Sequence, residues 1–393
     1  MNKAILQPDV QTFIIKNLNT NPADIALKKT PFTDVSIKEL AIQIDSRKRA
    51  EKKLPLWFGT QGIVYPQKIN IEQSSSEITA AYKASLLIGN YVVDASGGFG
   101  VDAYYFSLTA QKLTHCEKDL ELSEIVKHNL HLLGCNNVDF YGGDSIELIK
   151  QNNSKINTLY IDPSRRTEKG KVFKFEDCEP NVPKNLNFYL NKADRIIVKA
   201  APMLDIQFGL KELKNVSAIH IVSVKNECKE LLYVIDKNFT GVPDLVCAIL
   251  TPHNKSVLIK VKLDDEKDTV IKYSKIKQYL YEPDAAIFKA GLFKTVTQLF
   301  DVGKLNQNSH LYTSTDLVPN FAGRTLKIES VTPFATFEKQ NVKQQANVVC
   351  RNFALEPEDI KKKFKIGSSD NRFLYFTTDK NNLKVVIECS KVS

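Results

Sequence analysis

A glycine-rich turn near residue 97 constrains the fold of this chain more than any other feature of its sequence. The apolar segment 91–93 leads into Asp94, which is followed by the residues ASGGFGVD and then by a stretch with helical character. A strand, a glycine-rich turn and a helix in this order are typical of the first unit of a doubly wound α/β domain. We therefore expect a mostly parallel sheet covered by helices, with this turn at the carboxyl end of a strand.

The same turn bears on the ligand that such a domain would hold. Residues 98–103 fit the dinucleotide pattern G-x-G-x-x-A. Asp94, however, places a carboxylate where it would repel a pyrophosphate and attract the sulfonium and ammonium groups of S-adenosylmethionine. We interpret the turn as a methyl-donor site, with NAD as the alternative cofactor. The residues expected to bind the cofactor here are Asp94, Ser96, Gly97, Gly98, Phe99, Gly100 and Asp102.

The 393 residues are enough for two or three domains. Residues 1–78 have the apolar spacing of helices, and Asp34 or Ser36 is placed to cap one of them. Residues 79–236 alternate between strand-like and helix-like segments, which indicates the α/β domain. Residues 237–393 mix strands and helices without an internal repeat, and we expect an α+β region there.

The expected elements of the α/β domain are strands at 91–95, 112–117, 138–141, 158–162, 195–200 and 218–224, and helices at 119–133, 145–150 and 182–192. An antiparallel hairpin formed by 219–225 and 231–236 would end the sheet. The C-terminal region is expected to contain strands at 245–250, 257–263, 325–330, 342–352, 372–377 and 384–389, and helices at 283–298 and 356–363.

Acidic residues follow the next two strands of the predicted sheet. Glu117 ends the second strand, 23 positions after Asp94, where a carboxylate can hold both ribose hydroxyls. Asp144 ends the third strand, and it either accepts a hydrogen bond from the adenine amino group or caps the helix at 145–150. Gln73, before the first strand, is a further candidate for the methionine end of the cofactor, and Ser76 is placed to cap the next helix.

The fourth strand ends in the sequence YIDPSRR, at the switch point where ligands bind in such sheets. We expect Asp162, Pro163 and Ser164 to orient the methyl acceptor, and Asp162 also to border the cofactor. Arg165 and Arg166 suit a phosphate or a base face. As alternatives, the arginines would pair with nearby acidic residues in a structural turn, and Lys199, a further substrate candidate at the same rim, would serve only as an ion-pair partner.

The chain has a formal net charge of +9. This balance fits an anionic partner such as RNA, and it also fits a lysine-rich proteome. The basic run 47–53 stands close to Trp57, the sole tryptophan. We weigh a nucleic-acid contact against a solvated helix end followed by a core aromatic, and favour the second.

Other features bound the class of protein. No apolar run reaches the roughly 18–20 residues of a membrane span, and the first nine residues are not those of a signal peptide, so we expect the cytoplasm. The seven cysteines form no C-x-x-C pair, and the six histidines show no H-x-x-x-H or H-E-x-x-H spacing. We therefore expect neither a disulfide framework nor a bound metal.

These motifs resemble a family of bacterial class I S-adenosylmethionine-dependent methyltransferases with a THUMP-like C-terminal domain. The resemblance rests on residues 71–77 with 81–84, 94–102, 162–166, 281–292 and 351–353. It implies a ferredoxin-like piece at about 279–322, a THUMP-like piece at about 323–393, and RNA, often tRNA, as the partner of such domains. The pair Phe288-Lys289 stands where the family pattern leads us to expect an arginine.

The sequence therefore predicts an S-adenosylmethionine-dependent methyltransferase that acts on RNA by direct methyl transfer. No cysteine lies in a strand-end motif, which argues against a covalent cysteine mechanism. Two alternatives remain, which are a non-catalytic RNA-binding protein on the same scaffold and an NAD-dependent oxidoreductase with a Rossmann fold.

Overall fold

The computed structural model describes residues 1–164, 166–167, 170–171, 174–252, 256–340 and 344–392. The chain divides into two compact units. The first comprises Met1–Ile219 and Leu231–Gly241, and the second comprises His220–Glu230 and Val242–Ser393. No helix in the described part of the chain is long and apolar enough to cross a membrane.

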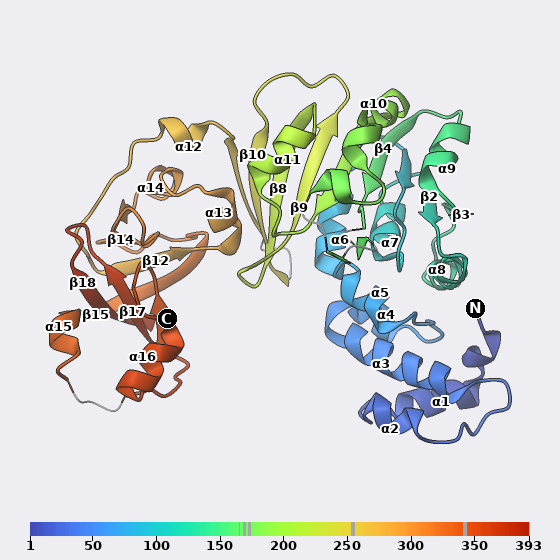
Figure 1. The fold of residues 1–393 in the computed structure, drawn as a ribbon, viewed down its shortest axis with the longest axis horizontal. Helices are drawn as coiled ribbons and strands as arrows, with labels where there is room; N and C mark the ends of the chain where they lie inside the picture. The colour runs from blue at the N-terminus through green and yellow to red at the C-terminus, as the bar shows by residue number, and fades with distance from the viewer. Residues whose placement is uncertain (165, 168–169, 172–173, 253–255, 341–343, 393) are drawn as a thin grey trace. The chain divides into compact units, whose positions relative to one another are not determined.

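The first unit begins with short helices, drawn in blue in Figure 1. They are η1 (Lys3–Leu6), α1 (Pro8–Lys16), α2 (Pro22–Ala26), α3 (Ile37–Lys53), α4 (Pro55–Gly59), α5 (Lys68–Gln73) and α6 (Glu77–Ala84). Ser36 and Glu39 form a capping box at the start of α3, and Ser76 caps α6. Both caps match the sequence predictions.

The basic run 47–53 forms the C-terminal end of α3. Arg47 is buried and donates to the Phe58 carbonyl oxygen, while Arg49 pairs with Asp45 and Glu72. Trp57 is fully buried in the core. The arrangement agrees with a helix end followed by a core aromatic.

Seven strands of the larger sheet follow the order β8-β9-β7-β4-β1-β2-β3, and the hairpin strands β8 and β9 have residues in both units. These strands are β1 (Tyr91–Asp94), β2 (Lys112–Glu117), β3 (Val138–Gly142), β4 (Ile156–Ile161), β7 (Ala193–Ala200), β8 (Val216–Val224) and β9 (Glu227–Asp236). The pairs β1–β2, β2–β3, β1–β4 and β4–β7 are parallel, and β9 is antiparallel to β7. The predicted fold class, a mostly parallel sheet that ends in an antiparallel hairpin, is confirmed.

Helices connect these strands and pack on the sheet (Figure 1). They are α7 (Val101–Ser107), α8 (Leu120–Leu132), α9 (Ser145–Gln151), α10 (Val182–Lys192) and α11 (Ile206–Glu212). Short elements between β4 and α10 are β5 (Arg166–Thr167), β6 (Gly170–Lys171) and η2 (Phe175–Asp177). Because the chain leaves β1 toward β2 and β3 and later returns to β4 on its other side, the carboxyl ends of β1 and β4 form a switch point.

The second unit contains a hairpin of β10 (Asp244–Leu250) and β11 (Val257–Lys262), followed by α12 (Asp265–Asp268). A further sheet has the order β13-β14-β12-β15-β18-β17-β16. Its strands are β12 (Tyr279–Pro283), β13 (Gly303–Lys304), β14 (Tyr312–Ser314), β15 (Gly323–Pro333), β16 (Asn347–Cys350), β17 (Arg372–Thr378) and β18 (Lys384–Lys391).

Alternating residues of β17 supply two cores, one on each face of this sheet. Phe373 and Tyr375 pack with residues such as Leu305, whereas Leu374 and Phe376 pack with Ile360. Helices α15 (Phe334–Phe337) and α16 (Pro357–Phe364) belong to the second core and lie on one side of the sheet (Figure 1).

One predicted helix of the second unit is wrong in its extent. The segment 283–298 was expected to be continuous, but the structure has the end of β12 followed by α13 (Ala285–Ala290) and α14 (Thr295–Leu299). Gly291 ends α13 in the left-handed conformation, with φ of 72°, and so interrupts the helix. The strand expected at 342–352 is shorter, at Asn347–Cys350, and residues 341–343 lie outside the described part of the chain.

Candidate functional site

The glycine turn after β1 is held against the end of β2 by backbone hydrogen bonds. The Gly97 N–H donates to the Cys116 carbonyl oxygen at 2.8 Å, and the Gly98 N–H donates to Glu117 Oε2 at 2.7 Å. The Gly143 N–H, after β3, donates to the Glu117 carbonyl oxygen at 3.0 Å. The structure therefore brings together three of the strand ends that the sequence singled out.

Three glycines of this turn have different structural roles. A Cβ atom at Gly97 would lie 2.2 Å from the His115 ring, and one at Gly100, where φ is +76°, would lie 2.5 Å from Val126. Gly98 also has a positive φ of +54°, but a Cβ there would meet no atom closer than 3.9 Å. Gly97 and Gly100 are thus required by packing, whereas the open side of Gly98 leaves its backbone accessible to a ligand.

Glu117 is fixed by two backbone amides. Its Oε2 accepts from Gly98, and its Oε1 accepts from the Asp119 N–H at 2.8 Å. Each carboxylate oxygen has a second lone pair, so this side chain can accept further hydrogen bonds from a pair of hydroxyl groups.

Asp144 caps α9, with its Oδ1 accepting from the Ile146 N–H at 2.8 Å and the Glu147 N–H at 3.3 Å. This confirms the structural role considered for it. Its second oxygen is not used by the cap, so binding to an adenine amino group stays a prediction.

The strand ends form an acidic environment. The pKa of the Cys116 thiol is raised to about 12, first by burial and then by the negative charges of Asp94, Glu117 and Asp144. Three carboxylates therefore act on one buried atom beside the glycine turn. Such a field favours a cationic ligand over a pyrophosphate.

Asp94 is almost completely buried, with 1% of its surface exposed. Its Oδ1 accepts from the Ser96 N–H at 3.1 Å, and its Oδ2 lies 3.5 Å from Nδ1 of the buried His115. Neither Oδ2 nor the two ring nitrogens of His115 have a hydrogen-bond partner among the described residues. Asp94 therefore supports the turn through its hydrogen bond from Ser96, and it acts on nearby groups such as Cys116 through its charge.

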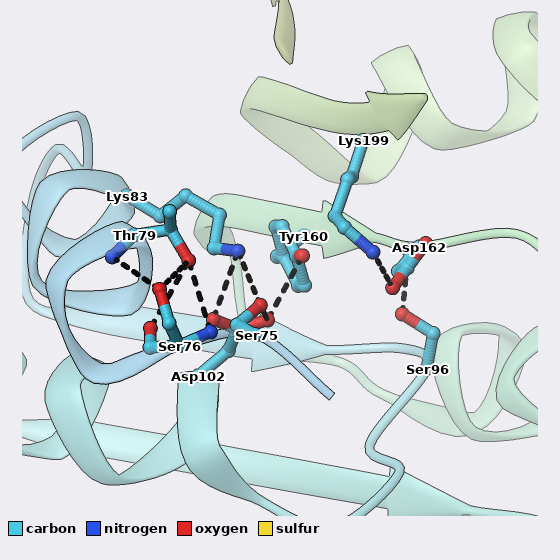
Figure 2. Close-up of polar contacts among 9 residues, drawn as sticks. All are labelled: Ser75, Ser76, Thr79, Lys83, Ser96, Asp102, Tyr160, Asp162 and Lys199. Carbon is cyan, nitrogen blue, oxygen red and sulfur yellow. Dashed lines mark hydrogen bonds and ion pairs between the residues drawn. The ribbon is translucent and has the colours of Figure 1, made fainter. Parts of the chain in front are cut away.

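A buried polar cluster holds the start of α7 against α6 (Figure 2). Lys83 is completely buried, and its Nζ lies 3.0 Å from Asp102 Oδ1 and donates to Ser75 Oγ at 2.5 Å. Asp102 Oδ2 accepts from Ser75 at 2.9 Å and from the Tyr160 hydroxyl at 3.1 Å. Asp102 is thus enclosed by protein partners, and it fixes the helix that follows the turn.

The sequence prediction assigned no role to Lys83. The sequence feature that could have indicated a buried Lys83 is its position on α6, where Ala80 and Ala84 lie on the same buried face. A lysine on an apolar helical face needs a buried counter-charge, but its partner cannot be identified from helical spacing alone.

Asp162 and Lys199, at the ends of β4 and β7, form an ion pair (Figure 2). The Asp162 N–H also donates to Ser96 Oγ at 2.6 Å, which links this segment to the glycine turn. Pro163 is buried, and the Ser164 backbone exchanges two hydrogen bonds with Glu179, at 2.7 and 3.1 Å. The ion-pair role considered for Lys199 is therefore present.

Other predicted site residues differ in their environments. Gln73 ends α5 and is exposed, whereas Phe99 is 3% exposed and packs near the Tyr65 ring. Arg165 lies outside the described residues, and only the backbone of Arg166, in β5, is described. In the described part of the chain, no three histidine, cysteine or acidic side chains form a group suited to a metal ion.

The parallel strands, the glycine turn and the acidic strand ends define the Rossmann-like class of methyltransferase folds. Family models match two segments of the second unit, a ferredoxin-like domain at residues 279–321 and a THUMP domain-like segment at 323–391. The crystal structure of a protein from Porphyromonas gingivalis W83, described as a putative methyltransferase, matches with 30% identity and a TM-score of 0.88, over 100% of this chain and 99% of that one. The chain belongs to this family of class I S-adenosylmethionine-dependent methyltransferases with a THUMP-like C-terminal domain.

More distant solved structures match only part of the chain. An rRNA methylase from Streptococcus thermophilus is 13% identical over 40% of this chain and 93% of that one, with a TM-score of 0.31. A protein from Streptococcus mutans in complex with SAH, described as a putative methyltransferase, is 13% identical over 41% of this chain and 96% of that one, with a TM-score of 0.30. No protein in the curated comparison matches this sequence significantly.

Proposed function

We propose that this protein is an S-adenosylmethionine-dependent methyltransferase that methylates RNA by direct transfer. The observation that carries the proposal is the position of Glu117. Its carboxylate is held by the Gly98 N–H beside the open side of that glycine, within the field of Asp94 and Asp144. A cationic donor that carries a ribose but no phosphate suits this surface, and NAD, with its pyrophosphate, does not.

In this proposal the chain's own residues divide the cofactor between them. The Gly98 backbone and the adjoining residues Ser96 and Gly97 line the donor, while Glu117 accepts from the ribose hydroxyls. Asp144 accepts from the adenine amino group with its unused oxygen. Gln73, which precedes β1 in the chain, contacts the methionine end of the cofactor. When bound, the cofactor supplies a methyl group on a positively charged sulfur. The sulfur is a good leaving group because it departs as a neutral thioether.

The acceptor side would be organised by Asp162. Lys199 holds the Asp162 carboxylate in place, and Ser96 accepts from its backbone N–H, so the side chain is positioned from two directions. We propose that Asp162, with the Pro163 and Ser164 backbone, orients the nucleophile toward the donor, so that positioning supplies most of the catalysis. Arg165 and Arg166 are proposed to hold a phosphate or a base of the substrate.

RNA as the acceptor is supported by the net charge of +9 and by the THUMP domain-like segment at 323–391. A protein that modifies cellular RNA in this way is expected in the cytoplasm. The modified nucleotide would be identified by mass spectrometry of nucleosides from cells with and without the gene.

The proposal is tested by incubating bulk RNA with labelled methyl donor and comparing the natural protein with Asp162→Asn. The matched control is Asp139→Asn, which changes an exposed carboxylate on β3 paired with Lys112. We expect label in RNA with the natural protein and the control, and at least tenfold less with Asp162→Asn. Equal label with all three proteins would contradict the role of Asp162, and RNA binding without any transfer would favour the non-catalytic alternative.

A further inference from the structure

A hollow of about 440 Å³ lies on the second unit. It is bordered by the end of β12, by α13, by the turn between β8 and β9, and by the residue that follows β16. The residues that matter for its chemistry are Asn226, Glu282, Phe288, Lys289 and Arg351. Its volume falls within the roughly 300–1,000 Å³ of pockets for small organic ligands.

A buried carboxylate holds two arginines at this place. Glu282 is 4% exposed, and its Oε1 accepts from Arg351 Nε at 2.9 Å and from its terminal nitrogen Nη2 at 2.5 Å. Its Oε2 accepts from Arg324 at 3.2 Å and from the Tyr375 hydroxyl at 2.9 Å. One carboxylate thus balances two guanidinium groups, each about 40% exposed, and the cluster keeps an excess positive charge.

The other lining groups add donors to this charge. Lys289 forms no ion pair with any described residue, and it lines the same hollow. Asn226 uses its Oδ1 to accept from the Ala285 N–H at 2.9 Å, so its amide NH₂ group is what it has left to offer a ligand. These groups together suit an anion with several acceptor oxygens.

An aromatic wall completes the hollow. The Arg351 guanidinium lies 5.6 Å from the centroid of the partly exposed Phe288 ring. Behind Phe288, His310 stacks on Phe293 with ring centroids 3.7 Å apart. The pKa of His310 is lowered to about 4 by burial and by the charges of Lys304 and Arg351, so this imidazole is neutral at pH 7 and the charge of the hollow comes from Arg351 and Lys289.

We propose that this hollow binds one nucleotide of single-stranded RNA, with its phosphate on Arg351 and Lys289 and its base against Phe288. A guanidinium beside an aromatic face is the combination that recognises a phosphate and a base together. The choice of RNA over another anion rests on the proposed function, but the anion-binding chemistry stands on the residues themselves.

The test measures the affinity of a fluorescently labelled, single-stranded oligoribonucleotide by anisotropy, for the full chain. We expect Arg351→Gln to weaken binding roughly 10-fold or more, because hydrogen bonds to charged groups are lost. Lys289→Gln is expected to weaken it less and to make the salt dependence shallower by about 0.7 in the log–log slope. Phe288→Leu should weaken binding without changing that slope.

Matched controls lie in the same unit. Arg372→Gln removes an arginine that is paired with Glu388 and is 39% exposed, and Lys275→Gln removes an exposed lysine outside the hollow. Both controls should stay within twofold of the natural protein. Equal losses in Arg372→Gln and Arg351→Gln would overturn the proposal, as would full competition by polyglutamate at concentrations near the oligonucleotide Kd.

The variants also separate this inference from the proposed function. Binding of S-adenosylhomocysteine, measured by calorimetry, should be the same in Lys289→Gln as in the natural protein. Loss of oligonucleotide affinity in the hollow variants, in a protein that transfers no methyl group, would uphold the hollow and contradict the methyltransferase proposal. Unchanged oligonucleotide affinity in Arg351→Gln, with methyl transfer intact, would contradict the hollow and uphold the methyltransferase proposal.

Discussion

The two units of this protein carry candidate binding surfaces of opposite charge. In the first unit, Asp94, Glu117 and Asp144 surround the end of β2 and raise the pKa of Cys116. In the second, Arg351 and Lys289 line a hollow in which Glu282 is the one carboxylate among the groups that matter. The proposed function needs this difference, because a surface that suits a cationic donor would repel an anionic acceptor, and the reverse also holds.

The first unit also contains a buried cation, Lys83, but this side chain belongs to the core and not to the acidic surface. Lys83→Met should lower the free energy of unfolding by about 3–5 kcal/mol, since it leaves the Asp102 carboxylate without its counter-charge. Urea denaturation would measure the change. The control Lys112→Met, in an ion pair exposed to solvent, should change stability by less than about 1 kcal/mol.

If Lys83 served the ligand surface instead, its variant would keep the natural stability and lose only ligand affinity. The double variant Lys83→Met with Asp102→Leu should recover part of the lost stability, because no unpaired charge then stays buried.

The acidic surface would be broken by Glu117→Gln. We expect the affinity for S-adenosylhomocysteine to fall by about 1.5–3 kcal/mol, because hydrogen bonds from the ribose to a carboxylate are replaced by weaker ones. Calorimetry would measure it. Glu121→Gln, on the exposed start of α8, is the matched control and should bind like the natural protein.

The basic surface should become more positive when His310 is protonated. Its pKa of about 4 is below the usual 6.5, so between these values the unfolded chain binds a proton that the folded chain does not. The free energy of unfolding should therefore fall as the pH drops from about 6.5 to 4, by on the order of 2 kcal/mol. Denaturation curves of the natural protein and His310→Phe would measure this, and an identical pH dependence of the two would contradict it.

Two glycines of the first unit test whether the ligand lies at the glycine turn. Gly98 and Gly134 both have positive φ, and a Cβ at either meets no close neighbour. Alanine at either position should cost about 1 kcal/mol of stability through the left-handed backbone. Only Gly98→Ala should also weaken binding of S-adenosylhomocysteine in calorimetry, and an equal affinity in both variants would place the ligand away from the turn.

Much of the first unit was predictable because its signals are local. Strand β2 spans the residues predicted for it, from Lys112 to Glu117, and the glycine turn follows β1 as its sequence indicates. The caps by Ser36, Ser76 and Asp144 likewise depend on residues only a few positions apart. In such segments the sequence pattern and the tertiary contacts favour the same structure.

The contacts that could not be predicted join residues far apart in the chain. Lys83 reaches Asp102, and Glu282 reaches Arg351, 69 positions away. Neither pair has a spacing that a helix or strand would dictate, so only the folded chain identifies the partners. The break between α13 and α14 was missed for a related reason, since Gly291 ends the helix although the apolar pattern continues.

The central claim is that the acidic strand ends select S-adenosylmethionine over a dinucleotide. Calorimetric titration of the natural protein with S-adenosylhomocysteine and with NAD tests it most directly. We predict binding of S-adenosylhomocysteine that Glu117→Gln weakens, and no heat with NAD. Binding of NAD, or no binding of S-adenosylhomocysteine, would contradict the account.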